Sequence, residues 1–396
     1  MTVFDVTGYY NHQKILNIIK SASRFLALDV FRGLTVCFMI IVNTPGDGAT
    51  PFSPLLHASW HGFTPTDLVF PSFLFAVGNA MSFSMEKYRA LGDGAFFGKV
   101  IKRTLLIFLL GYLMYWFPFF TIENGHFYLK PISHTRVMGV LQRIALCYLF
   151  ASLLIRYLST RGVMIVSIIL LFGYWLLLLA YGTPGEVYGM QTNAGYYLDK
   201  FILGENHLYH GEGVAFDPEG ILSTLPSIVN VIIGYYAGVF IQQKGKNYET
   251  VARLLLAGGV LICLALIWNV YFPINKKLWS SSFVLLTTGI DLAIIGGLIY
   301  IVEIRKAGAP EKGWTKFFTI FGKNPLFIYL LSELLAILLY QINVSKKQSV
   351  FSWLNSVFYQ RIAPGPVGSL LFALSFMMLC WSVGWWLDKR KVYIRV

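Results

Sequence analysis

The sequence places side chains that could do chemistry at the start of a strongly apolar stretch. Residues 57–78 read HASWHGFTPTDLVFPSFLFAVG and hold His57, His61 and Asp67 close to the apolar run that begins at Leu68. An imidazole can act as a general base or carry an acyl group, and a carboxylate ten residues further on could orient it. Polar groups beside an apolar helix are costly unless they are paired or used. We therefore predict an active site here, centred on His57.

Several other chemistries are disfavoured by the motifs in the sequence. His57 and His61 are four residues apart, but they form no HExxH motif and lie among Pro and Gly, so we expect no metal site. The chain has no GxSxG elbow, Walker motif or dinucleotide-binding fingerprint. Its four cysteines all lie in apolar runs without metal-like spacing, so we also expect no disulfides.

The composition is that of a membrane protein. Of 396 residues, 56% are hydrophobic and 13% are charged, and the mean hydropathy is +0.62; a soluble domain carries about 25% charged residues. Apolar runs of about 20 residues, enough to span a bilayer, recur along the chain. We predict an all-α polytopic protein with ten spans, at Leu26–Val42, Leu68–Met85, Val100–Phe117, Val137–Ile155, Met164–Tyr181, Leu222–Ile241, Leu254–Phe272, Phe283–Val302, Phe318–Leu339 and Val367–Trp386.

The basic residues predict the orientation of these spans. One set of connections holds 21 Lys and Arg residues and the opposite set holds seven. The positive-inside rule then places both termini in the cytoplasm, and the His57 loop and the connection 182–220 outside. The net charge of +13 is explained by topology and anionic lipid, so we expect no nucleic-acid partner. Residues 1–24 are a cytoplasmic tail, either an interfacial helix or unstructured, and 25–396 form one transmembrane domain.

Charges within predicted spans are functional candidates. Asp29 and Arg32 are three residues apart on the first span, so they could form a neutral pair or hold a ligand. Arg136 and Arg143 are seven residues apart in RVMGVLQR, which puts both on one helix face with Gln142 beside them. We predict that these residues form a polar seam in the membrane.

Other candidates lie at span ends, where a purely structural role competes with a functional one. Asn43 ends the first span and could be a helix cap or part of the site. Asp217 and Glu219 precede the sixth span and suit its helix dipole. Trp279 opens the eighth span, and Lys323 begins the ninth, where a snorkelling lysine is the simpler interpretation.

Six segments resemble the heparan-α-glucosaminide N-acetyltransferase family of transmembrane acyltransferases. They are RFLALDVFRG, HASWHGFTPTDLVFPSFLFAVG, RVMGVLQRIAL, DPEGILSTLPSI, LWSSSFVLLTTG and GKNPLFIYLLSE, which follow the family order over nearly the whole chain. The resemblance implies acetyl-CoA as the donor, His57 as the catalytic histidine, and family counterparts for Asn43 and Asp67. The chain departs from lysosomal relatives at His61, where they tend to have asparagine, and in lacking their large luminal N-terminal portion.

We therefore expect a bacterial inner-membrane enzyme that moves an acetyl group from cytoplasmic acetyl-CoA to the amino group of an external amino sugar, such as a terminal glucosamine. His57 would take a proton or carry the acetyl group, and Asn43 with nearby backbone amides would stabilise the oxyanion. Arg32, Arg143 and Lys323, on the cytoplasmic or middle parts of their helices, would hold the CoA phosphates. Gln142, with Arg143 and Arg32, would line the seam that the pantetheine arm follows. The acceptor would contact Trp60, Asp217, Glu219 and Trp279.

Two other functions stay open at this stage. A transporter of sugars or cell-wall fragments would also need many spans and intramembrane charges, although the chain lacks the repeats and paired broken helices that favour one. An O-acetyltransferase of a surface polysaccharide would use the same donor. The expected partners are the amino-sugar acceptor and membrane lipid, and a homodimer is left open.

Overall fold

The structure is a computed structural model that describes residues 25–394, except 48–49, 90–91, 124–125, 308–312 and 346–347. The predicted tail 1–24 lies outside the described residues. Among the described residues, eight helical segments are long and apolar enough to cross a membrane. Helix dominates this part of the chain, so the all-α polytopic class is confirmed. The long helices are α2 (Leu26–Asn43), α3 (Val69–Arg89), α4 (Asp93–Trp116), α5 (Val140–Tyr157), α6 (Thr160–Tyr181), α8 (Thr224–Lys244), α9 (Tyr248–Trp268), α10 (Ser281–Leu298) and α15 (Pro366–Lys389).

The ninth predicted span is wrong as a single helix. It divides into α11 (Gly313–Lys323) and α12 (Pro325–Gln341), bent by 78° at the break. Pro325 is the first residue of α12 and restricts the residue before it, which explains the break at Asn324. Lys323 therefore ends a short helix and does not begin a span. Helix α4 lies at the third predicted span but is not one of the eight segments. Each of those has an apolar stretch of 18 residues with at most two charged side chains, whereas α4 carries Lys99, Lys102 and Arg103.

The connections contain short elements that the hydropathy pattern did not predict. Two antiparallel hairpins pair β1 (Phe120–Glu123) with β2 (His126–Leu129), and β3 (Asn343–Ser345) with β4 (Gln348–Ser349). A π-helical segment, η5 (Ile299–Ile304), extends α10. The short helices are η1 (Ser53–Leu55), η2 (Pro65–Leu68), η3 (Ile132–His134), α7 (Ala194–Leu203), η4 (Glu205–His207), α13 (Val350–Leu354), η6 (Asn355–Tyr359) and α14 (Gln360–Ile362).

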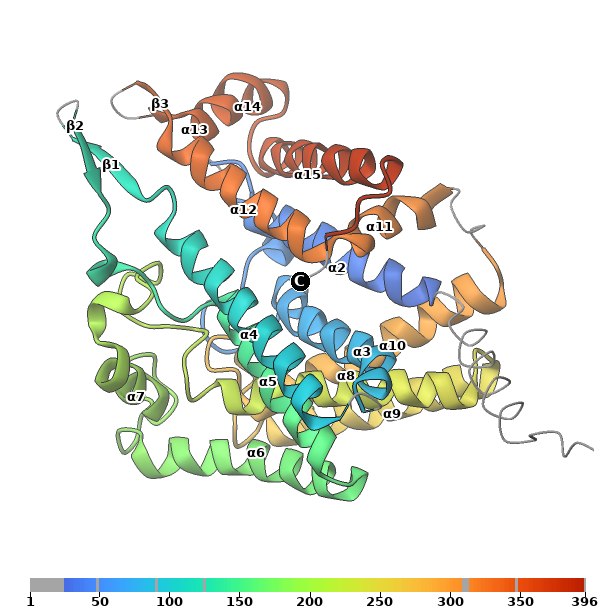
Figure 1. The fold of residues 1–396 in the computed structure, drawn as a ribbon. Helices are drawn as coiled ribbons and strands as arrows, with labels where there is room; N and C mark the ends of the chain where they lie inside the picture. Colours follow the sequence, from blue (N-terminus) through green and yellow to red (C-terminus); the bar gives the residue numbers. More distant parts are fainter. Residues whose placement is uncertain are drawn as a thin grey trace, which may run out of the picture.

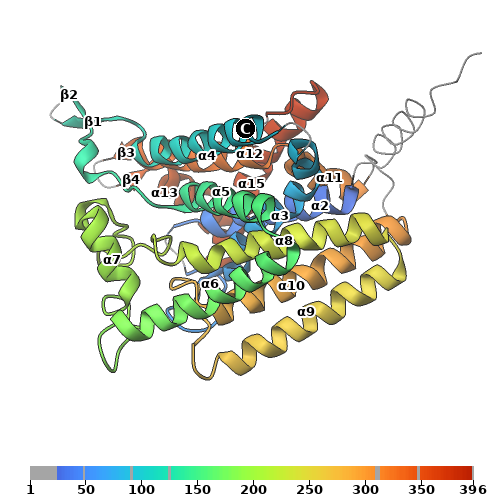
Figure 2. The ribbon, with the colours of Figure 1, turned by 60° about the horizontal axis from the view of Figure 1, so that its bottom comes forward.

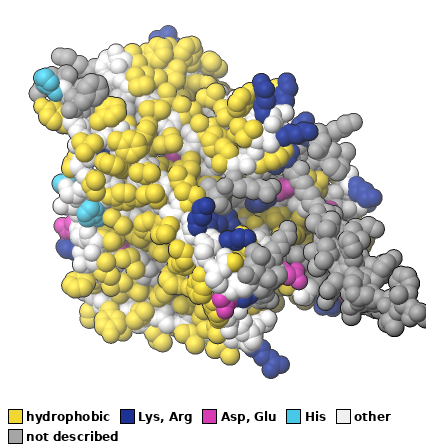
Figure 3. All heavy atoms as spheres, in the orientation of Figure 1, with side chains coloured by type: hydrophobic (Ala, Val, Ile, Leu, Met, Phe, Trp, Pro, Cys, Tyr) yellow, Lys and Arg dark blue, Asp and Glu magenta, His cyan; other side chains and the backbone are white. Residues whose placement is uncertain are grey.

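The helices run between two ends of the molecule. Both hairpins and α7 lie at the left of Figure 1, and the start of α2 lies at the right. We call the left end the site end, because Trp60, in the loop of His57, donates there to the Tyr188 carbonyl oxygen, in the connection between α6 and α7. The right end is the basic end: Lys246 there pairs with Glu303 at 2.9 Å, and Lys323 pairs with Asp388. Figure 3, in the same view, shows most of the visible basic side chains in its right half.

Close packing of α3 against α8 fixes the helix that carries the predicted site. Figure 2 shows α3 lying between α2 and α8, while α6 and α9 run along the outside. A Cβ at Gly78 would come within 1.9 Å of the Val231 carbonyl oxygen, and one at Gly234 within 2.1 Å of the Phe75 carbonyl oxygen. Two reciprocal glycines thus let the backbones touch, as small residues do in membrane bundles. The start of α3 is held rigidly as a result.

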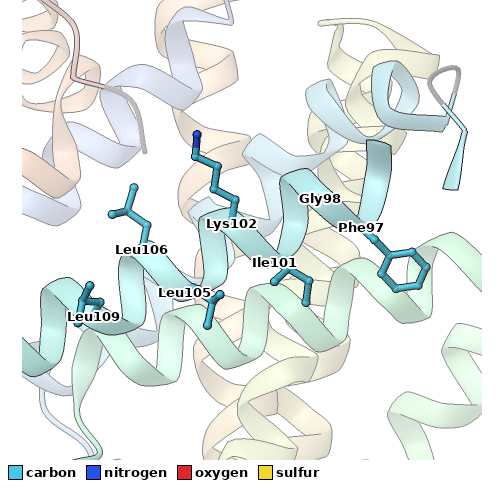
Figure 4. A pocket seen from close by; sticks show the side chains of 7 residues that line it. All are labelled: Phe97, Gly98, Ile101, Lys102, Leu105, Leu106 and Leu109. Atoms are coloured by element: carbon cyan, nitrogen blue, oxygen red, sulfur yellow. The ribbon is translucent and has the colours of Figure 1, made fainter. Parts of the chain in front are cut away.

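Much of the outer surface is apolar (Figure 3). On α4 a shallow groove is lined by Phe97, Ile101, Leu105, Leu106 and Leu109, with Lys102 at its edge (Figure 4). None of these residues contributes to the polar clusters described below. A continuous apolar face of this kind is typical of a helix that contacts lipid.

Candidate active site

The structure joins His57 and Asp67 at the site end. His57 Nδ1 lies 2.7 Å from Asp67 Oδ1, and the His57 side chain is 39% exposed, whereas that of Asp67 is 1% exposed. With its proton on Nδ1, the imidazole would donate to this carboxylate and leave the Nε2 lone pair for chemistry. The predicted orienting role of Asp67 thus has the required geometry, the pairing that holds the histidine of a catalytic triad.

The local sequence explains why Asp67 is buried there. Pro65 starts the short helix η2, and the Thr64 backbone N–H donates to Asp67 Oδ2 at 2.9 Å. The Thr64 hydroxyl and the Ala58 backbone N–H also lie within 3.2 Å of Oδ2. Asp67 therefore closes the loop that presents His57, and its contacts are compatible with both the structural and the orienting interpretation.

A small cavity of about 60 Å³ opens beside His57. It has room for a few water molecules, so a sugar would have to bind at its mouth, where His57 is exposed. The cavity draws side chains from α2, η2, α3, α5 and α12 and from three connections; its lining is Met39, Val42, Asn43, His57, Thr66, Val69, Phe70, Val140, Glu219, Lys276 and Tyr329. Asn43 and Glu219 therefore lie at the predicted site.

Lys276 is the main residue that sequence reasoning missed. Its Nζ lies 3.0 Å from His57 Nε2 and 3.3 Å from Nδ1. Burial lowers the Lys276 pKa below its ordinary value, and Glu219 and Asp67 act in the opposite direction. Its position in the sequence was the available signal: Lys276 is one of only seven basic residues on the predicted external side, and only Lys277 separates it from the LWSSS segment.

Asp217 and Glu219 share one guanidinium. Arg136 Nη2 lies 2.6 Å from Asp217 Oδ1 and 2.6 Å from Glu219 Oε2, and Tyr115 and Tyr209 lie over its faces. Burial alone would raise the pKa of Glu219, but Arg136, Arg143 and Lys276 hold that pKa below its ordinary value. Arg136 precedes α5 instead of sharing its face with Arg143, so the helix prediction began three residues early. Both acids lie in the connection that precedes α8 and are paired with Arg136, so the helix dipole is not their only electrostatic partner.

A second residue that sequence reasoning missed is Glu333, whose carboxylate faces the first helix. Asn43 Nδ2 donates to Glu333 Oε1 at 3.0 Å. Tyr329, one turn before Glu333 on α12, lines the cavity, and both Glu333 and Glu219 interact with it electrostatically. Two carboxylates therefore flank the cavity from opposite elements. The sequence could have indicated Glu333, because it is a single acidic residue within an apolar predicted span. Ionisable residues within membrane spans are usually functional.

A second cavity, of about 90 Å³, lies further toward the basic end. Arg32 and Arg103 both line it, with Ile107 from α4, Ile144 and Tyr148 from α5, residues of α3, and Pro325 and Leu326 from α12. Arg32 forms the predicted ion pair with Asp29. The buried Nε atoms of Arg32 and Arg103 have no hydrogen-bond partner among the described residues. The chemistry of this lining, two guanidiniums over an apolar wall, fits an anionic group carried on an apolar arm.

A stripe on α4 runs from the second cavity to the Arg136 cluster. Arg103 and Ile107 line the second cavity, Gly111 contacts Gln142, and Tyr115 Oη lies 3.3 Å from Arg136 Nη1. These α4 positions are spaced four residues apart and so lie on one face, over about 18 Å. Gln142 is fully buried beside the stripe, and neither of its amide atoms has a partner in the described part of the chain.

Three predicted site residues lie elsewhere. Arg143 points toward the site end, where Nη2 donates to the Gly220 carbonyl oxygen at 3.0 Å, and it does not line the second cavity with Arg32. Trp279 is fully buried, with Arg143 over its ring, so it cannot stack on a sugar in this conformation. Lys323 pairs with Asp388 outside the second cavity. Trp60 lies in the same loop as His57 and is half-buried. It donates from Nε1 to the Tyr188 carbonyl oxygen at 3.0 Å.

Metal ligands do not gather in the described chain. No group of three His, Cys, Asp or Glu side chains there could hold a metal ion. The expectation that no metal takes part stays a prediction.

Comparisons with known proteins agree with the resemblance read from the sequence. The family model described as heparan-alpha-glucosaminide N-acetyltransferase, catalytic, matches residues 24–261, more than half of the chain. The heparan-alpha-glucosaminide N-acetyltransferase of Mus musculus is 28% identical over 374 residues, covering 80% of this chain and 54% of the relative. The Homo sapiens protein of the same name is 28% identical over 365 residues, covering 78% and 52%. The chain thus spans about half the length of the curated relatives it matches.

Proposed function

This chain belongs to the heparan-alpha-glucosaminide N-acetyltransferase catalytic family, and on that premise we propose that it is a multi-pass membrane acetyltransferase. It transfers an acetyl group from acetyl-CoA to the amino group of an amino sugar. The observation that carries the proposal is the arrangement of two cavities along one set of helices. The His57 cavity and the Arg32 cavity are both lined from α2, α3, α5 and α12.

His57 is the proton acceptor of the proposed reaction. An ammonium group must lose a proton before its nitrogen can attack a thioester. Asp67 holds the proton on Nδ1, so Nε2 is free to take a proton from the nitrogen of the acceptor. Alternatively, Nε2 itself accepts the acetyl group before the amine arrives. In either case a C–N bond to the amine forms, the C–S bond of the thioester breaks, and CoA leaves as the thiol.

The acceptor amine binds between two carboxylates. Glu219 and Glu333 approach the cavity from different elements, and Glu333 has Asn43 as its hydrogen-bond partner. A protonated amine forms charge-assisted hydrogen bonds with such groups, whereas a hydroxyl cannot bring the positive charge. This arrangement favours an amine acceptor over a hydroxyl acceptor. The sugar ring then lies at the open mouth, near Trp60.

The donor enters from the basic end. Arg32 and Arg103 would hold phosphates of CoA, and the pantetheine arm would follow the α4 stripe past Gln142 toward His57. Arg32 and Asn43 are eleven residues apart on α2, about 16 Å at helical rise. The nucleotide then stays on one side while the thioester reaches the other. The basic end faces the cytoplasmic side of a bacterial inner membrane. Acetyl groups from cytoplasmic acetyl-CoA therefore reach sugars outside.

Purified protein in detergent tests the proposal directly. Acetyl-CoA is supplied together with glucosamine and with glucose, an acceptor that offers only hydroxyls. We expect N-acetylated product, release of free thiol, and loss of both with His57→Ala. O-acetylated product alone would favour a polysaccharide O-acetyltransferase, and neither acetyl transfer nor acetyl-CoA hydrolysis would favour a transporter.

A further inference from the structure

Lys276 places a cation at the nitrogen that the proposed reaction uses. Its Nζ is 3.0 Å from His57 Nε2 and almost as close, 3.3 Å, to Nδ1. A group nearly equidistant from both ring nitrogens is not in line with the Nε2 lone pair. Lys276 therefore lies beside the reacting atom without occupying the position that a proton or an acetyl carbon must take.

The turn that presents Lys276 is rigid. The Trp279 backbone N–H donates to the Lys276 carbonyl oxygen at 3.0 Å, and the Asn275 side chain accepts from the Leu278 N–H at 2.8 Å. Ser280 closes the turn by accepting from the Asn275 N–H at 3.0 Å. Trp279 is held at φ 54°, a left-handed conformation that is costly for a bulky residue. Strain of this kind persists where the surroundings fix a functional geometry.

Titratable groups from several connections surround Lys276. Glu219 and Asp67 are acids that favour its protonated form, and His57 is its nearest titratable neighbour. Lys277 repels it weakly but is itself bound to Glu212 and, at 3.0 Å, to the Ser59 carbonyl oxygen. Tyr329 shares the cavity. Burial lowers the Lys276 pKa below its ordinary value, and the acids limit that effect.

We propose that Lys276 is the oxyanion-binding cation of the acetyl transfer, a role that rests on the proposed function. When the amine nitrogen attacks the carbonyl carbon, the C–N bond forms and the carbonyl π electrons move to oxygen. Lys276 donates an N–H hydrogen bond to that negative oxygen. His57 Nε2 takes the proton that the attacking nitrogen loses as the C–N bond forms; the additional proton of an ammonium group has already left to water. The carbonyl then re-forms, the C–S bond breaks, and the CoA thiolate takes the proton from His57. Preorganised donors of this kind contribute most when charge develops.

The test compares Lys276→Met with Lys276→Arg in purified protein. Removing one oxyanion donor typically lowers kcat by about 10² to 10³, so Lys276→Met should do so with little change in the KM for acetyl-CoA. Lys276→Arg should recover at least about tenfold of that loss, because it restores a cationic donor. Lys277→Met, in the same turn, is the matched control, since it removes a structural tether and leaves the cation beside His57.

The pH profile gives a readout that a structural role would not move. Wild-type turnover should fall at alkaline pH as Lys276 loses its proton, below the ordinary lysine pKa, and Lys276→Arg should shift that fall to higher pH. Lys277→Met should keep the wild-type alkaline limb. If Lys276→Met does not fold, the pH profiles of wild-type protein and Lys276→Arg still test the proposal.

Three results would overturn the assignment: Lys276→Met within about threefold of wild-type kcat, an alkaline limb unchanged by Lys276→Arg, or acetylation of Lys276 itself found by mass spectrometry. Failure of the proposed function is distinguishable, because wild-type protein would then make no N-acetylated product at all.

Discussion

Replacing Gln142 with methionine should make the protein more stable and its donor binding weaker. The Gln142 side chain is fully buried, and neither Nε2 nor Oε1 has a partner among the described residues. An unsatisfied buried polar group costs about 1–3 kcal/mol, although hydrogen bonds in membrane proteins average only about 0.6 kcal/mol. Methionine keeps the length and nearly the volume of glutamine. We therefore expect Gln142→Met to raise the free energy of unfolding by about 1–3 kcal/mol.

The same substitution should weaken CoA binding if Gln142 lies on the donor path. One lost hydrogen bond of about 1–1.5 kcal/mol raises Kd about fivefold to tenfold. Asn79 offers a matched control, because it is also fully buried, on α3, with both amide atoms unpartnered in the described chain. Neither residue lines either cavity, but Gln142 lies against Gly111 of the α4 stripe, whereas Asn79 lies against Gly238 of α8. Asn79→Leu should leave CoA affinity unchanged, whatever its effect on stability.

The assay pairs reversible unfolding in detergent micelles with calorimetric titration of CoA. Stabilisation together with weaker binding for Gln142→Met, and unchanged binding for Asn79→Leu, supports the path along the α4 stripe. A destabilised Gln142→Met protein that binds CoA with wild-type affinity would refute the reasoning, since the amide would then serve packing alone.

Four other predictions concern the site end. A cysteine at the exposed Ser53 should react with a membrane-impermeant reagent in intact cells; labelling only after lysis would reverse the topology. His57→Ala should cut turnover about a hundredfold or more, and His61→Asn much less; equal losses would point to a shared structural role. Asp67→Asn should cost about a hundredfold or more, because the amide oxygen would accept from the Thr64 and Ala58 N–H groups and the N–H₂ group would donate to His57 Nδ1, which favours the wrong His57 tautomer; near-normal turnover would exclude an orienting role. Glu333→Gln should raise the KM for the amino sugar about tenfold but not that for acetyl-CoA; a change confined to the donor would misplace the acceptor.

Periodicity and composition predicted most of the helices because membrane spans need long apolar runs. They could not predict the break at Asn324, where Pro325 interrupts a run that stays apolar on both sides. The hairpins and α7 were also missed, because short elements in connections carry little periodicity. Arg136 was assigned to a helix face because apolar residues follow it at once, whereas the structure leaves it in the preceding loop beside Asp217.

The site was predictable where partners are close in sequence. His57 and Asp67 lie ten residues apart, and the cap chemistry of Thr64 and Asp67 could be read locally. Lys276 meets His57 across 219 positions, a distance over which a single sequence gives no spacing signal. Glu333 could have been found, because the rule applied to basic residues in spans applies equally to acids.

The central claim is that donor and acceptor meet from opposite sides of the membrane, and sealed inside-out vesicles test it most directly. Glucosamine is trapped in the lumen and radiolabelled acetyl-CoA is added outside, at the basic end. The account predicts N-acetylglucosamine inside the vesicles, dependent on His57, while acetyl-CoA stays outside. Product that forms only when donor and acceptor share one side would contradict it.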